Sequence, residues 1–114
     1  MDKILEQALL YDFYGELLTA HQKEIYEQFV LDDLSLGEIA ADAGISRQGV
    51  HDLIRRCNKI LEEYEAKLHL VAKFVKIRDM AREVEQLADE CARTRDMALI
   101  EQIHGLAGKI TGTL

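Results

Sequence analysis

The chain contains no proline in its 114 residues, and this absence constrains the fold more than any other single feature. Roughly five or six prolines would be expected, because proline makes up about 5% of an average protein. Proline removes a backbone donor and kinks or ends a helix. A chain without it can form long uninterrupted helices, so the sequence predicts an all-α fold.

Composition excludes several classes of protein. The two cysteines are too few for a disulfide-rich scaffold, and no run of about 18 apolar residues is present to span a membrane. The N-terminus lacks the basic and then apolar pattern of a secretory signal, so we expect a cytoplasmic protein. The net charge of −7 argues against a general nucleic-acid coat, because binding phosphates requires many Lys and Arg residues.

The acidic charge is concentrated at the start of the chain. Residues 1–34 contain eight acidic and two basic side chains, whereas residues 69–114 contain seven of each. A solvated helix face explains this concentration. Repulsion of nucleic acid, or attraction of a basic partner, is the alternative explanation.

Strong signals for the beginning and the end of helices lie between residues 19 and 46. The segments 19–22 (TAHQ) and 35–38 (SLGE) each have the spacing of a capping box. Gly44 stands where a left-handed residue ends a helix, and Ser46 can cap the next one. The predicted helices cover residues 4–18, 20–31 and 36–43, followed by one that begins at residue 47.

The two helices on either side of Gly44 predict a helix-turn-helix. In such a unit Arg and Gln side chains of the second helix can read base edges, and Arg or Lys side chains can bind phosphates. The free amide groups at the Ser46 end also suit a phosphate. The candidate nucleic-acid-binding residues are Ser46, Arg47, Gln48, His51, Arg55 and Lys59.

A packing scaffold without a nucleic-acid partner is the alternative interpretation of this unit. Asp52 lies beside the candidate face, and the acidic segment precedes it. The basic side chains of residues 55–59 would then be solvated or paired with Glu62 and Glu63 at helical spacing.

A heptad pattern follows the predicted turn. Apolar residues recur at spacings of 4 and 3 from Val50 to Val75, so we predict one helix from about residue 47 to 77. The second half of its stripe needs a partner, and we expect a homodimer. The expected oligomer seam consists of Leu61, Tyr64, Leu68, Val71 and Val75.

The tail continues the helical pattern beyond residue 78. We expect residues 1–78 to form a helix-turn-helix domain that includes the long helix. Residues 79–114 would form a C-terminal helical extension that packs on the same domain or on a dimer partner. A weak break falls at residues 92–96, where Thr94 could cap the last helix.

Residues for catalysis or metal binding do not group in recognisable motifs. The four histidines, His21, His51, His69 and His104, lack the spacing of a zinc site, and no P-loop or serine elbow is present. We interpret the two thiols, at residues 57 and 91, as buried, and the aromatic residues at positions 11, 13 and 14 as core. We expect no enzyme, cofactor, metal or small-molecule substrate.

Several stretches resemble a known family. The segments YDFY, LLT, DDLSLGEIA, SRQ-V-D-I-R and LEEYEAKL agree in order and spacing with the YlxM family, and the wider segment is similar to region 4 of bacterial sigma factors. The resemblance covers roughly residues 9–78. The tail after Asp79 matches poorly, so it is interpreted from its pattern alone.

The resemblance implies a sigma-region-4-like helix-turn-helix core with a long recognition helix and C-terminal helices. It also implies a cytoplasmic regulatory protein that acts with the signal recognition particle, through the targeting GTPase or its RNA. No catalytic residue carries over, and the nucleic-acid-facing positions that do are Ser46, Arg47, Gln48, His51 and Arg55. The alternatives are a dimeric DNA-binding transcriptional regulator and an adaptor that contacts only protein.

Overall fold

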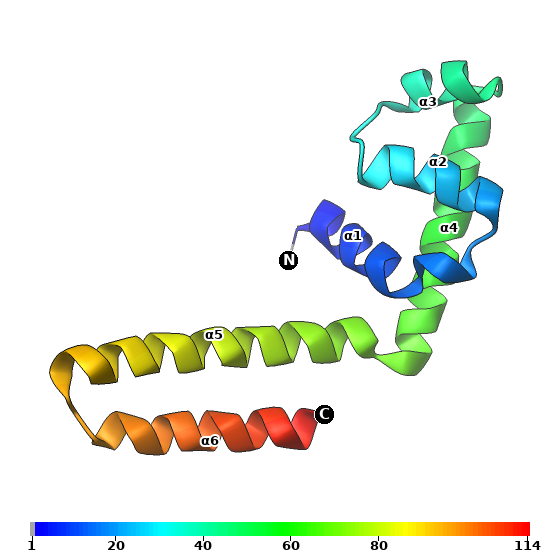
Figure 1. Ribbon diagram of the computed structural model, residues 1–114. Helices are drawn as coiled ribbons and strands as arrows, with labels where there is room; N and C mark the ends of the chain where they lie inside the picture. The colour runs from blue at the N-terminus through cyan, green and yellow to red at the C-terminus, as the bar shows by residue number, and fades with distance from the viewer. Residues whose placement is uncertain (1) are drawn as a thin grey trace. The chain divides into compact units, whose positions relative to one another are not determined.

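The computed structural model describes residues 2–114, in which every regular element is a helix (Figure 1). The chain forms two compact units, of which the first ends at His69 and the second covers Leu70–Leu114. The first unit contains α1 (Lys3–Tyr14), the 3-10 turn η1 (Gly15–Leu17), α2 (Ala20–Val30), α3 (Leu36–Ala43) and α4 (Arg47–Leu68). The second contains α5 (Leu70–Thr94) and α6 (Ala98–Thr113). The predicted all-α helix-turn-helix fold is confirmed.

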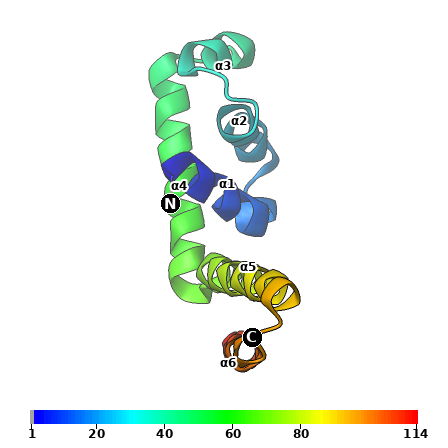
Figure 2. The same ribbon diagram turned by 90° about the vertical axis from the view of Figure 1, so that its left-hand side faces the viewer.

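The first unit is built around α4. Helices α1, α2 and α3 all contact it and lie along one side of it (Figures 1 and 2). Four residues of the heptad pattern lie in this core: Val50, Ile54, Cys57 and Leu61 are all buried. The apolar stripe in the first half of α4 is therefore buried within its own unit.

The predicted caps are confirmed. Thr19 begins α2 and Ser35 begins α3, each with both hydrogen bonds of a capping box. Gly44 ends α3 with a φ of 70°, a left-handed conformation that glycine adopts without a Cβ clash. Local hydrogen bonding thus determines where α2 and α3 begin and where the turn lies.

The buried face of α1 differs from the predicted one. The helical spacing of the apolar residues in this segment predicts one inward face made of Ile4, Leu5, Ala8, Leu9, Phe13 and Leu17. Ala8 and Leu9 are half-buried, but the other four are exposed. The structure buries Leu10 instead. It also buries Tyr11 and Tyr14, as expected for the aromatic residues of this segment, whereas Phe13 is exposed.

Hydrogen bonds explain why the tyrosines replace the aliphatic residues. The Tyr11 hydroxyl donates to Glu27 of α2, and the Tyr14 hydroxyl donates to Glu65 Oε1 of α4 at 2.6 Å. Burial, followed by the hydrogen bond to Glu27, raises the pKa of Tyr11, so its hydroxyl remains a proton donor. A buried tyrosine is stable when its hydroxyl has such a partner, and counting apolar residues does not reveal one.

Gly15 is required where α1 passes into η1. A Cβ added at this position would lie 2.7 Å from the Tyr11 ring, which is itself buried. We expect Gly15→Ala to lower the free energy of unfolding by about 1–3 kcal/mol, as overpacking does. Urea denaturation checks this value. The matched control is Gly105→Ala in α6, where nothing lies within 4 Å, and that change is expected to leave stability unchanged or raise it. Equal effects of the two changes would contradict this account of Gly15.

A helix-turn-helix with this spacing is expected to place Ile45, Val50 and Ile54 between its two helices. Val50 and Ile54 are buried, but Ile45 is 39% exposed. Helices α3 and α4 contact each other, and Ile39 of α3 and Val50 of α4 are fully buried. In α2, Tyr26 is fully buried, whereas Phe29, expected inward, is only half-buried. The Tyr26 hydroxyl donates to Asn58 of α4. A tyrosine is therefore again buried where the apolar pattern assigned the inward position to another residue, here Phe29.

The single long helix predicted from residue 47 to 77 is wrong. Helix α4 ends at Leu68, His69 has a φ of 58°, and α5 begins at Leu70. Histidine is one of the few residues enriched at positive φ, but neither Gly nor Pro marks the break. The boundary between the compact units therefore falls at His69, ahead of the expected boundary after residue 78. The expected seam is divided between two helices, and its first member, Leu61, is fully buried in the first unit.

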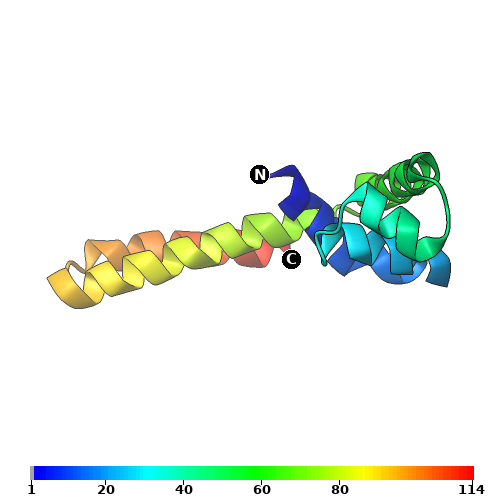
Figure 3. The ribbon, with the colours of Figure 1, turned by 90° about the horizontal axis from the view of Figure 1, so that it is seen from above.

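The second unit is an antiparallel pair of helices. Helices α5 and α6 lie side by side in Figures 1 and 3 and contact each other along their length. The helical spacing predicts one apolar stripe on each of these helices. Met80 and Leu99 are buried, and the other members of the two stripes are half-buried: Val84, Leu87, Cys91, Ile103, Leu106 and Ile110. The predicted break is confirmed, but Thr94 does not cap the last helix, whose N-cap is Met97 without a side-chain hydrogen bond. Asp96 Oδ1, just before it, accepts from the Ala98 amide at 3.0 Å. No helix in the described residues is long and apolar enough to cross a membrane.

Candidate nucleic-acid interface

The predicted binding residues lie together on the first half of α4. Ser46 is the N-cap, and the other five residues follow in the helix at positions 47, 48, 51, 55 and 59. All six are exposed. The helix-turn-helix therefore presents these side chains to solvent, while the opposite side of the same helix packs in the core.

Ser46 has a structural task at the start of this face. Its Oγ accepts a hydrogen bond from the Gly49 amide at 2.9 Å, which caps α4. The cap satisfies one of the free amide groups at the helix N-terminus. The hydroxyl therefore orients the helix, and the charged residues that follow it are the ones available for a ligand.

One carboxylate engages part of the face. Gln48 Nε2 donates to Asp52 Oδ1 at 3.0 Å, and His51 Nδ1 lies 3.8 Å from the same oxygen. Asp52 therefore holds the Gln48 amide along the helix surface. A ligand that hydrogen-bonds Gln48 has to displace this contact.

Three unpaired cations follow Asp52. Arg55, Arg56 and Lys59 line an open hollow of about 390 Å³ together with Asp52. Within residues 2–114 the side chains of these three residues form no ion pair. They are solvated, which the packing-scaffold alternative also allows, and they do not pair with Glu62 and Glu63. Arg56 was not among the predicted site residues, although its position four residues after Asp52 is the signal that places it here.

Arg47 lies at the turn between the two helices of the motif. Its Nε is 3.7 Å from where a Cβ on Gly37 would be, so its side chain lies over the first turn of α3. The absence of a side chain at Gly37 leaves this position open. Arg47 thus extends the site from α4 toward the start of α3. We call the exposed surface formed by Arg47, Gln48, His51, Arg55, Arg56 and Lys59 the basic face.

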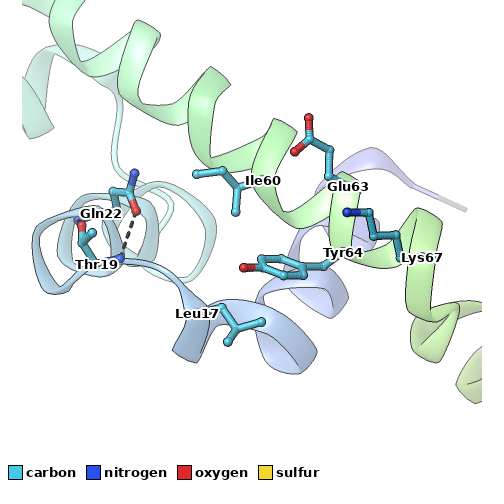
Figure 4. A pocket seen from close by; sticks show the side chains of 7 residues that line it. All are labelled: Leu17, Thr19, Gln22, Ile60, Glu63, Tyr64 and Lys67. Carbon is cyan, nitrogen blue, oxygen red and sulfur yellow. Dashed lines mark hydrogen bonds between the residues drawn. The ribbon is translucent and has the colours of Figure 1, made fainter.

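A second hollow lies on another side of α4 (Figure 4). It has a volume of about 460 Å³ and lies between η1, the start of α2 and the second half of α4. Leu17, Ile60 and Tyr64 form its apolar part, and Glu63 and Lys67 lie beside them on α4. Its one acid and one base balance, so it has no electrostatic preference for phosphate. The six predicted residues do not line it.

Metal-binding and nucleophilic groups do not gather near the basic face. Within residues 2–114 no group of three or more His, Cys, Asp or Glu side chains could hold a metal ion. Burial raises the pKa of the Cys57 thiol to about 11, so this thiol stays protonated near neutral pH. Cys91, expected to be buried, is half-buried, and its thiol donates to the Asp96 carbonyl.

Comparison with known proteins identifies the family. Residues 1–102 match the UPF0122 family model, described as "Putative helix-turn-helix protein, YlxM / p13 like". A UPF0122 protein of Halalkalibacterium halodurans is 43% identical over 93% of this chain and 98% of its own length. The UPF0122 protein YlxM of Bacillus subtilis is 40% identical over 93% of this chain and 97% of its own length. A UPF0122 protein of Acetivibrio thermocellus is 51% identical over 74% of this chain and 72% of its own length.

The match extends beyond the segment that carried the resemblance in the sequence. It continues past residue 78 through α5 and into α6, so the view that the tail after Asp79 matches the family poorly is wrong. The family model therefore covers α5 and the start of α6 as well as the helix-turn-helix. The chain belongs to the UPF0122 family of YlxM / p13-like helix-turn-helix proteins.

Proposed function

We propose that this chain is a non-enzymatic regulatory protein of the signal recognition particle pathway, and that the basic face of α4 docks on the particle's RNA. The signal recognition particle is proposed because of the family resemblance, which also implies the particle's GTPase as a possible contact. One observation supports the RNA contact: Arg47, Arg55, Arg56 and Lys59 are exposed on the recognition helix without ion-pair partners. A cytoplasmic location is part of this proposal.

The acidic remainder of the chain limits how RNA can bind. Only a few cations face the ligand, so the contact neutralises few phosphates and cannot coat a long stretch of nucleic acid. A small basic face in an acidic protein favours a defined local structure over a general polyanion, because the rest of the surface repels phosphate. This restriction suits docking on one site of a structured RNA.

The non-enzymatic part of the proposal rests on where the reactive groups lie. The Cys57 thiol is fully buried and its pKa is raised, so it is unsuited to act as a nucleophile. The exposed groups of the basic face are cations and amides, which bind phosphates and bases. These groups support recognition.

Duplex DNA is the second candidate partner. The observation that favours it is the placement of Arg47, Gln48, His51 and Arg55 on the exposed side of the second helix of the motif, where such proteins read the major groove. A selection from randomised duplexes at low salt tests this function. Enrichment of a defined sequence supports DNA recognition, and a pool without enrichment excludes it.

We further propose that the helical hairpin of the second unit mediates a homodimer. In a hairpin of two helices, each helix covers only part of the other's apolar stripe. The apolar residues beside the line of contact remain exposed. In α6 the buried Leu99 and the half-buried Ile103 and Leu106 form one line, which Ile100, 44% exposed, widens on one side. A second hairpin packed on this side would give a four-helix arrangement.

Sedimentation at micromolar concentration tests the homodimer. The wild type is expected to sediment at twice the 13.0 kDa of one chain, and Ile100→Asp is expected to shift it to monomer, because the change buries an unpaired charge. Gln102→Asp introduces the same charge on the polar side of α6 and is expected to leave the dimer intact. A wild-type monomer, or equal effects of the two changes, would contradict the proposed interface.

A further inference from the structure

We infer that a groove beside the basic face binds one unpaired nucleotide of RNA. The inference rests on the proposed function and adds the kind of RNA structure that the face recognises. The groove has a volume of about 380 Å³ and is lined by residues of α1, α2, α3 and α4, so the fold of the first unit assembles it. It shares His51 and Arg55 with the basic face.

The walls of the groove are mainly apolar. Ile4, Phe29, Leu36 and Ile54 contribute one side chain from each of the four helices. Ile4 is 58% exposed, although it belongs to the first turn of α1 beside this hollow. Apolar and aromatic surfaces of this kind accept the face of a nucleobase. Bases inside a duplex are stacked on their neighbours, so only an unpaired base can enter.

Two amide side chains supply hydrogen bonds. Gln7 of α1 and Asn58 of α4 both line the groove. Asn58 Oδ1 accepts from the buried Tyr26 hydroxyl, which holds the amide in one orientation and leaves its Nδ2 group to donate. Nucleobase edges present acceptors that amide groups recognise. An apolar side chain of a peptide would leave both amides without partners.

The charges of the groove match a phosphate. Its charged or titratable lining residues are Lys3, His51 and Arg55, and no carboxylate is among the lining residues. Asp52 approaches His51 from outside the groove. An acidic peptide would satisfy these cations, but the two amides and the continuity with the basic face favour a nucleotide whose strand continues along α4.

Fluorescence anisotropy with five labelled RNA stem-loops tests the inference. One stem-loop is fully paired, and the other four differ from it only by one bulged nucleotide, with each of the four bases placed there in turn. The wild type is expected to bind at least one bulged RNA about tenfold more tightly than the paired RNA, as stacking on one base provides. Ile4→Ser is expected to abolish this preference without changing the affinity for paired RNA. Leu5→Ser, at the neighbouring exposed position outside the groove, is expected to retain the preference.

The outcomes separate this inference from the proposed function. Equal binding of paired RNA and all bulged RNAs overturns the groove inference, while binding that Arg47→Ala weakens still supports the RNA function. Failure to bind any of these RNAs or the particle's RNA overturns both. Binding of an acidic amphipathic peptide that Ile4→Ser abolishes, with no preference among the RNAs, assigns the groove to a protein and overturns the inference.

Discussion

Replacing Arg47 and Arg55 together with alanine is expected to lower the affinity for the signal recognition particle RNA by about 100-fold at low salt. Each arginine is exposed and has no ion-pair partner in the described chain, so both are available for the ligand. An arginine contact to a base or phosphate contributes about 1–3 kcal/mol, and every 1.4 kcal/mol is tenfold in affinity. The slope of log affinity against log salt should fall by about two, because two phosphate contacts are lost.

The matched control removes the same charge elsewhere. Lys73 and Lys76 are exposed on α5 in the second unit, and Lys73→Ala with Lys76→Ala gives the same net charge as the arginine variant. We expect this control to bind RNA nearly as the wild type does. Equal losses in the two double variants would show that net charge, and not the face of α4, governs binding.

Leu61→Ala is expected to lower the free energy of unfolding of the first unit by about 3 kcal/mol, as truncation of a buried leucine does. Leu61 is fully buried, and it lies in the half of α4 that α1 and α2 contact. Leu68→Ala, one heptad later and 50% exposed, is the control and is expected to change stability by less than about 0.5 kcal/mol.

Urea denaturation at two protein concentrations distinguishes a core residue from an oligomer residue. A loss at Leu61 that is the same at both concentrations shows that the side chain stabilises its own unit. A loss that appears only at one concentration, or an equal loss at Leu68, would instead place both residues in a seam between copies.

The helix-turn-helix could be predicted from the sequence because local interactions determine it. Capping at Thr19, Ser35 and Ser46 involves residues three positions apart, and Gly44 ends α3 through its own backbone freedom. These signals lie within the segment that they organise, so a single sequence shows them. The exposed position of the predicted α4 residues follows from the same helical register.

The break at His69 could not be predicted in this way. The heptad spacing continues from Val50 to Val75 across it, and the same 3-and-4 spacing suits a helix packed in a small core and a helix in a coiled coil. Tertiary packing decides between them. In this chain α1, α2 and α3 all pack against α4, the apolar residues from Val50 to Leu61 that follow the heptad pattern are buried, and the helix ends at Leu68.

The groove also depends on contacts that are distant in sequence. Lys3 and Gln7 of α1 line it together with Arg55 and Asn58 of α4. The helical spacing assigns Ile4 to the inward face of α1, whereas the structure buries Tyr11 and Tyr14, whose hydroxyls donate to Glu27 and Glu65. Ile4 is exposed beside the groove. No local pattern reports this difference, because the partners of the tyrosines lie on α2 and α4.

Retention by the signal recognition particle tests the central claim most directly. The particle's protein is immobilised with and without its RNA, and the wild type is compared with the Arg47→Ala, Arg55→Ala variant. We predict that the wild type is retained by the RNA-containing particle and that the variant is lost from it. Absence of retention in both conditions, or equal retention of the wild type and the variant, would contradict the account.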